Sequence, residues 1–214
     1  MSGAPGKMYP EVKSMIRSKH GPWGQGRLQI EHTVGHDPDL SLTQSWQTDL
    51  WWHVYADEHP DGEERRTRMG YILWSLVEMR LGASRVLSDL DSIGAEELSL
   101  GDALTHIEIT GRLTELCDVA VLISHVDLAQ PARSIGLEYL AVRDITRIVT
   151  FGRDEPMVLI NPTHQTGLPR DWSTLEFDPV LTDHEIWIGD AAKILRTPKA
   201  SICEPWLAEA WLGD

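Results

Sequence analysis

The segment from Cys117 to Pro162 constrains the fold more than any other part of this chain. Val119–Leu128 is an almost continuous apolar and β-branched run, typical of a strand buried on both faces, and 157–160 is a shorter one. Between them, over 137–148, apolar residues recur at helical spacing and charged residues fall on the other side. This order predicts a β-α-β unit, in which a right-handed helical crossover joins two neighbouring parallel strands.

Alternating apolar and polar residues predict the rest of a sheet. Further strands are expected at 27–34, 48–56, 69–77, 179–181 and 185–188. A connection containing Pro-Asp-Gly separates the second and third of these, which favours antiparallel pairing. Residues 84–105 have a helical pattern that Gly94 and Gly101 are expected to divide. The predicted fold class is α/β (α+β): a mixed, mostly antiparallel sheet with helices on both faces.

The length of 214 residues fits one domain with appendages. The domain is expected over 26–190, after a glycine- and proline-rich arm over 1–25 and before a tail over 191–214 that docks on the domain. The start of the chain has no signal-like apolar region, and no run has the roughly eighteen apolar residues of a membrane span. A cytoplasmic protein is therefore the simplest expectation.

The charge balance restricts the partners. With 33 acidic and 19 basic side chains the formal net charge is -14, which disfavours nucleic acid and anionic membrane surfaces. Cys117 and Cys203 are the only cysteines and form no C-x-x-C motif, so a disulfide framework or structural zinc is not expected. His32 and His36 have i, i+4 spacing, but this stretch reads as a strand and no metal site is predicted.

The turn between the buried strand and the following helix is a candidate anion site. It reads Arg-Ser-Ile-Gly-Leu-Glu over 133–138. Backbone N–H groups at the start of a helix lack intrahelical acceptors, so such a turn can bind phosphate. One glycine is a weak signal, and a simple strand-to-helix turn is an equal alternative.

Two motifs resemble the GNAT superfamily of acyltransferases. Arg133-x-x-Gly136-x-Glu138 resembles the family's R/Q-x-x-G-x-G/A loop, and the segment over 172–180, WSTLEFDPV, resembles its Y-x-x-L-G-F-x-x-V motif. The resemblance implies a GNAT-like fold and transfer of an acyl group from acetyl-CoA or another acyl-CoA to a small amine, for which the acidic composition favours a cationic acceptor. It assigns the coenzyme pyrophosphate to Arg133, Ser134, Ile135, Gly136, Leu137 and Glu138.

Acyl transfer to an amine also needs a group that accepts the amine proton. His125 and Asp127 lie two positions apart on the buried strand, so they share one face, and the resemblance places a base near His125. Trp172 stands where the family often has a proton-donating tyrosine, so Tyr139 or Tyr55 is a candidate replacement. The alternative for His125 is a histidine that simply satisfies its hydrogen bonds within the sheet.

Nine tryptophans are many for this length. Trp52, Trp74 and Trp172 are candidates for an aromatic substrate pocket, and the alternative is a large core together with a homodimer interface. Glu138 and Trp172 each replace a family element. This leaves a second function open: a GNAT-like fold without coenzyme A chemistry, which binds a small molecule or a partner or catalyses a different reaction in the same cleft.

Overall fold

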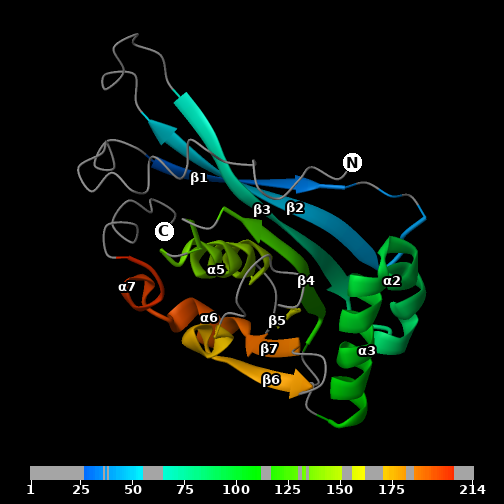
Figure 1. The fold of residues 1–214 in the computed structure, drawn as a ribbon. Coiled ribbons are helices and arrows are strands. Elements are labelled where there is room, and N and C mark those ends of the chain that lie inside the picture. Colours follow the sequence, from blue (N-terminus) through cyan, green and yellow to red (C-terminus); the bar gives the residue numbers. More distant parts are fainter. Residues whose placement is uncertain are drawn as a thin grey trace.

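A computed structural model describes residues 27–35, 37, 39–54, 65–111, 117–129, 132–133, 135–150, 156–161, 171–181 and 186–204. These residues form a seven-stranded sheet in the order β1-β2-β3-β4-β5-β7-β6, with helices packed against it (Figure 1). The strands are β1 (Arg27–Val34), β2 (Thr43–Val54), β3 (Arg65–Glu78), β4 (Val119–Leu128), β5 (Met157–Ile160), β6 (Phe177–Leu181) and β7 (Ile186–Asp190). The α-helices are α2 (Leu87–Ile93), α3 (Ala95–Ile109), α5 (Leu137–Thr150), α6 (Ala191–Arg196) and α7 (Lys199–Ile202). Short 3-10 turns are η3 (Ala83–Arg85) and η5 (Trp172–Leu175).

The pairing of the strands confirms the predicted kind of sheet. β4 and β5 run parallel on either side of the α5 crossover, and every other neighbouring pair is antiparallel. β2 and β3 pair as predicted, but both are longer than the alternating pattern indicated. The predicted arm over 1–25 and the end of the tail beyond 204 lie outside the described residues.

The alternation of β4 builds two hydrophobic cores, one on each face of the sheet. Val121 and Ile123 lie in the core that α5 covers, whereas Ala120 and Leu122 lie in the core that α2 and α3 cover. Successive side chains of a strand point to opposite faces, so the unbroken apolar run of β4 is what two covered faces require. Helices therefore lie on both faces, as predicted (Figure 1).

The segment after β7 packs back on the α5 side. Ile194 of α6 and Ile202 of α7 are buried in the same core as α5. Asp190 accepts hydrogen bonds from the backbone N–H groups of Ala192 (2.7 Å) and Lys193 (3.3 Å), which caps α6. None of the helices in the described ranges is long and apolar enough to cross a membrane.

The prediction that Gly101 divides the helical stretch over 84–105 was wrong. Gly94 does separate α2 from α3, but Gly101 lies inside α3 and is buried. A Cβ at Gly101 would lie 2.6 Å from Leu90 Cδ1 and 2.9 Å from Leu87 Cδ2. The absence of a side chain therefore allows α2 and α3 to pack closely, which offsets the low helix propensity of glycine.

Candidate functional site

A β-bulge in β4 decides where the two predicted acid–base residues point. Leu73 of β3 pairs with His125, but the next residue, Trp74, pairs with Ile123, so Ser124 is an extra residue in β4. Beyond the bulge, Val126 continues the core that Ile123 lines before it. One extra residue reverses the alternation of a strand. His125 therefore points to the face opposite α5, where strict alternation would have buried it beneath that helix.

The resulting site lies on a part of the sheet that no described helix covers. On this face, α2 and α3 pack around Val77, Ala120 and Leu122, towards one end of the strands. Towards the other end, polar and aromatic side chains of β1 to β4 are left partly exposed. This open face is defined by Glu31, Asp49, Trp51, Arg66, Arg68, Tyr71, His125 and Asp127.

Tyr71, His125 and Asp127 form the acid–base part of the open face. The rings of Tyr71 and His125 stack with centroids 5.6 Å apart and an interplanar angle of 26°. Asp127 is directly opposite Tyr71 in the β3–β4 register. Burial and the nearby charge of Asp127 raise the pKa of Tyr71, and they outweigh the opposing effect of Arg68. The phenol therefore stays protonated beside an imidazole and a carboxylate.

Two arginines extend the open face towards β1. Arg68 forms an ion pair with Asp49, and Arg66 forms one with Glu31. The guanidinium carbon of Arg66 lies 3.9 Å from the centroid of the Trp51 ring, and that of Arg68 lies 5.0 Å from the Tyr71 ring. These stacked cations hold both ion pairs against aromatic rings, a cation–π arrangement.

The sequence predicts part of this site and misses the rest. His125 and Asp127 do share a face, and both are half-buried. Tyr71 and Arg68 were not predicted, because nothing in a single strand shows which residues of the next strand lie opposite. The alternation of β3 could have marked Tyr71 as facing away from Ile72, but the bulge in β4 has no sequence signal.

The predicted phosphate-binding turn is buried against the C-terminal segment. Gly136 has a φ of 79°, and a Cβ there would lie 2.2 Å from the backbone oxygen of Ile202. The N–H of Glu204 donates to the backbone oxygen of Ile135 at 3.1 Å. Arg133 donates from Nε to the backbone oxygen of Leu128 at 2.7 Å. Ile202 and its neighbours therefore lie directly against the turn that the resemblance assigns to pyrophosphate.

The other predicted residues of the turn are also inaccessible or outside the described part of the chain. Leu137 and Glu138 are 0% and 1% exposed, and Ile135 is 8% exposed. Ser134 falls between described residues. The turn thus has the position that was predicted, after β4 and before α5, but Ile135, Gly136, Leu137 and Glu138 are buried and only Arg133 is half-buried among its described residues.

Tyr139 and the three predicted pocket tryptophans belong to the α5-side core. Trp52, Trp74 and Trp172 are at most 2% exposed. Tyr139 packs edge-on against Trp172, with ring centroids 5.2 Å apart, and its hydroxyl donates to the backbone oxygen of Asp171 at 3.1 Å. The structure therefore does not bring Tyr139 together with His125, because α5 and His125 lie on opposite faces of the sheet.

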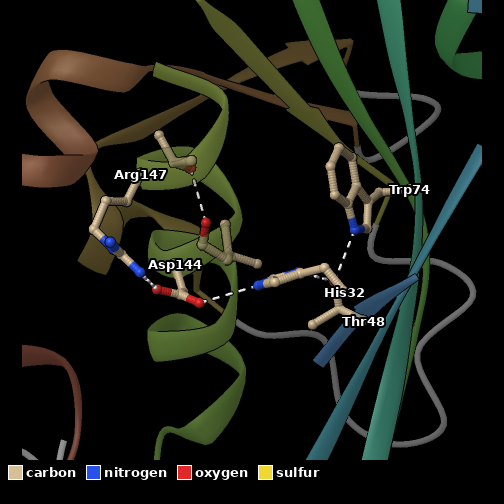
Figure 2. Close-up of polar contacts among 7 residues, drawn as sticks. His32, Thr48, Trp74, Asp144 and Arg147 are labelled. Atoms are coloured by element: carbon tan, nitrogen blue, oxygen red, sulfur yellow. Dashed lines mark hydrogen bonds and ion pairs between the residues drawn. The ribbon is translucent and has the colours of Figure 1, made fainter. Parts of the chain in front are cut away.

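A second polar cluster lies between the sheet and α5 (Figure 2). Trp74 donates from Nε1 to Thr48 Oγ1 at 2.8 Å, and Thr48 Oγ1 lies 2.9 Å from Nδ1 of His32. The other ring nitrogen, Nε2, lies 3.2 Å from Oδ2 of Asp144, whose Oδ1 accepts two hydrogen bonds from Arg147. If Nε2 of His32 carries the proton, the Trp74 indole, the Thr48 hydroxyl and the His32 imidazole each donate to the next residue in this series.

This buried cluster joins β1, β2 and β3 to α5. The order carboxylate, imidazole, hydroxyl is that of a nucleophilic triad, but Thr48 is 0% exposed and cannot meet a substrate. Asp144 was expected on the solvent side of its helix. It is instead only 7% exposed, because the edge strand β1 reaches over α5 and brings His32 to it. We assign this cluster to stability.

Comparison of the chain with family models, with curated proteins and with solved structures finds no match.

Proposed function

We propose that the open face binds a small cationic amine and that His125 accepts a proton from it, as one half of an N-acyl transfer from an acyl-CoA. The observation that supports this best is the position of His125, stacked on Tyr71 and two residues from Asp127 on the same face of β4. An imidazole is a suitable base near neutral pH, and a neighbouring carboxylate attracts the ammonium form of the amine.

The chemistry would divide between the three side chains. The bound ammonium first loses one proton to solvent, and the free amine attacks the thioester carbonyl. His125 takes the second amine proton as the C–N bond forms, and collapse of the tetrahedral intermediate then breaks the C–S bond and releases the coenzyme thiolate, which solvent protonates. Tyr71, whose phenol is protonated at neutral pH and whose pKa is raised further by burial and by Asp127, can donate a hydrogen bond to the carbonyl oxygen while negative charge develops there. Asp127 would hold the amine beside both rings.

The proposal that acyl-CoA is the acyl donor rests on the resemblance to the GNAT superfamily. β4 and β5 pair last at Ile123 and Ile160, and His125 follows two residues beyond this point. The start of α5, to which the resemblance assigns the pyrophosphate, follows the same strand. A GNAT-like identity for the seven-stranded sheet with its one parallel pair is part of this proposal.

A second candidate function is favoured by the contact between Gly136 and Ile202. The N–H of Gly136 already donates to the backbone oxygen of Arg133 at 3.1 Å, and the backbone of Ile202 lies against the Cα of Gly136, so this turn does not present a free amide to a diphosphate. In this alternative the open face binds its amine without coenzyme A, and the chain is a small-molecule-binding module or catalyses a different reaction. The two candidates share the amine site and differ in the donor.

Calorimetric titration of acetyl-CoA, at low and moderate salt, separates the two candidates. The acyltransferase proposal expects micromolar binding that Arg133→Glu abolishes and that Arg85→Glu, an exposed arginine on η3, leaves intact. Because Arg133 also bonds to Leu128, circular dichroism must first show that the variant is folded. The absence of any heat of binding at millimolar acetyl-CoA would reject the proposal that the chain binds acyl-CoA and would leave the second candidate function.

A further inference from the structure

We propose that Arg68 is a positioning residue for the proposed acyl transfer and acts through Tyr71. Its guanidinium, held over the phenol ring, stabilises the negative charge that moves towards that ring when Tyr71 donates a hydrogen bond to the reacting carbonyl. This inference rests on the proposed function and assigns one more residue to it. Two bulges in the sheet, the contacts that fix Arg68 and the charges around Tyr71 support it.

A bulge in β3 brings Arg68 to the face of the sheet that carries Tyr71. The register of β2 and β3 shifts between Leu50 and Trp51, so that Met69 is an extra residue in β3. Met69 is 2% exposed and lies in the core that α5 covers. Residues three positions apart in a regular strand point to opposite faces, and one extra residue reverses this. Arg68 therefore lies on the open face together with Tyr71.

The bulge at Ser124 of β4 does the same for His125. Between these two bulges, a Cβ at Gly70 would lie 2.4 Å from the backbone oxygen of Asp127. The absence of a side chain at Gly70 therefore allows β3 and β4 to approach closely beside Tyr71. Bulges are frequent next to active sites, where they redirect side chains. Here each of the two bulges brings one side chain to the same phenol ring.

An ion pair holds Arg68 over the Tyr71 ring. Nη2 of Arg68 donates to Oδ1 of Asp49, whose Oδ2 accepts a hydrogen bond from Gln47 at 2.9 Å. The guanidinium carbon of Arg68 lies 5.0 Å from the centroid of the Tyr71 ring. Asp49 is 16% exposed and Arg68 is 33% exposed, so solvent screens this pair less than a fully exposed pair. A positive charge therefore has a fixed place against the phenol.

Arg68 opposes the other influences on the phenol. Burial raises the pKa of Tyr71 most, the charge of Asp127 raises it further, and the charge of Arg68 lowers it. A cation over an aromatic ring is attracted to the negative charge of that ring, and more strongly as this charge grows. A phenol with a lower pKa is also a stronger hydrogen-bond donor. Arg68 therefore makes Tyr71 a better donor to a developing oxyanion than burial beside Asp127 would allow.

The first test measures the pKa of Tyr71 by NMR in protein labelled at the tyrosine ¹³Cζ. The chain has four tyrosines, and Tyr71→Phe identifies the signal. Arg68→Gln should raise this pKa, and Arg68→Lys, which keeps the charge, should raise it less. Arg66→Gln removes a cation of the same strand that lies over Trp51, and it should also raise the Tyr71 pKa less than Arg68→Gln does. An unchanged Tyr71 pKa in Arg68→Gln would overturn the inference whatever its effect on activity.

The second test measures thiol release from acetyl-CoA with an amine that supports turnover. Arg68→Gln should lower kcat by about fivefold or more without raising the KM for the amine, a smaller loss than the roughly 10²- to 10³-fold of removing an oxyanion donor outright. Because Arg68 acts through the phenol, Arg68→Gln should cause no further loss in a Tyr71→Phe background. Arg80→Gln, at an exposed position just beyond β3, should retain the kcat of its parent in both backgrounds.

The outcomes separate this inference from the proposed function, once circular dichroism shows that each variant is folded. An unchanged kcat in Arg68→Gln, or equal losses in the wild-type and Tyr71→Phe backgrounds, would overturn the action of Arg68 through Tyr71 while the proposed function stands. No amine-dependent thiol release from the folded wild-type protein would overturn the proposed function and this inference with it.

Discussion

Asp144 shows how one buried carboxylate ties α5 to the edge of the sheet. Its two oxygens contact His32 of β1 and Arg147 of its own helix. Burial by itself raises the pKa of Asp144, but the hydrogen bonds and charges of His32 and Arg147 outweigh burial and hold that pKa below its usual range. The charged form is therefore the one that the fold stabilises. No sequence pattern indicates a contact between residues 112 positions apart.

Replacement of Asp144 should remove a pH dependence from stability. A lowered pKa in the folded state means that the stabilisation is present above the usual pKa of 3.8 and is lost as the pH falls through the folded value. We expect Asp144→Asn to lower the free energy of unfolding at neutral pH by about 3 kcal/mol, because it breaks a buried charge pair. The difference from wild type should shrink below about pH 4.

Urea unfolding at several pH values measures this difference. Asp91→Asn, at an exposed position of α2, is the matched control and should follow the wild-type curve. A constant gap between wild type and Asp144→Asn from about pH 7 to about pH 3 would contradict the role given to the carboxylate charge.

β4 and α5 are the elements that position the open face and the turn over 133–138. The apolar run of β4 predicts its bounds, because a strand covered on both faces has no polar positions to interrupt it. The bulge at Ser124 is not predictable in this way, since it depends on how β3 and β4 pair. The amphipathic pattern predicts α5, yet Glu138 is buried at its start and Asp144 is buried near its middle. The contact with His32 of β1 accounts for the burial of Asp144.

Gly136→Ala should loosen the contact between the start of α5 and the C-terminal segment. A Cβ at Gly136 would lie 2.2 Å from the backbone oxygen of Ile202, and the residue has a positive φ of 79°. Gly111 also has a positive φ, 69°, but nothing lies within 4 Å of a Cβ there. Gly111→Ala should therefore cost only backbone strain, about 1 kcal/mol, and Gly136→Ala at least twice as much.

Thermal unfolding and amide hydrogen exchange distinguish the two glycine variants. Gly136→Ala should lower the melting temperature more, and it should speed exchange at Glu204, whose N–H donates to Ile135. Equal losses of stability in both variants, with unchanged exchange at Glu204, would show that the closeness of Ile202 has no energetic consequence.

The whole molecule was predictable as a fold but only partly as a site. The spacing of apolar residues along the chain indicates which positions are buried, and this spacing distinguishes strands from helices. The mostly antiparallel sheet and the parallel β4–β5 pair therefore follow from the sequence. The site depends on pairing register and on contacts between distant segments. His125 and Asp127 were identified by their spacing in the sequence. Tyr71 and Arg68 can be assigned to the site only from the way β3 pairs with β2 and β4.

The most direct test of the proposed function is the rate of thiol release from acetyl-CoA in the presence of an amine panel that includes amino acids. We expect turnover with at least one amine, and we expect His125→Asn to reduce kcat/KM by about 10² to 10⁴-fold, the usual contribution of a general base. His106→Asn, at an exposed position of α3, should retain wild-type turnover. Equal rates for wild type and His125→Asn, or no amine-dependent thiol release from the folded wild-type protein, would contradict the assignment of N-acyl transfer to the open face.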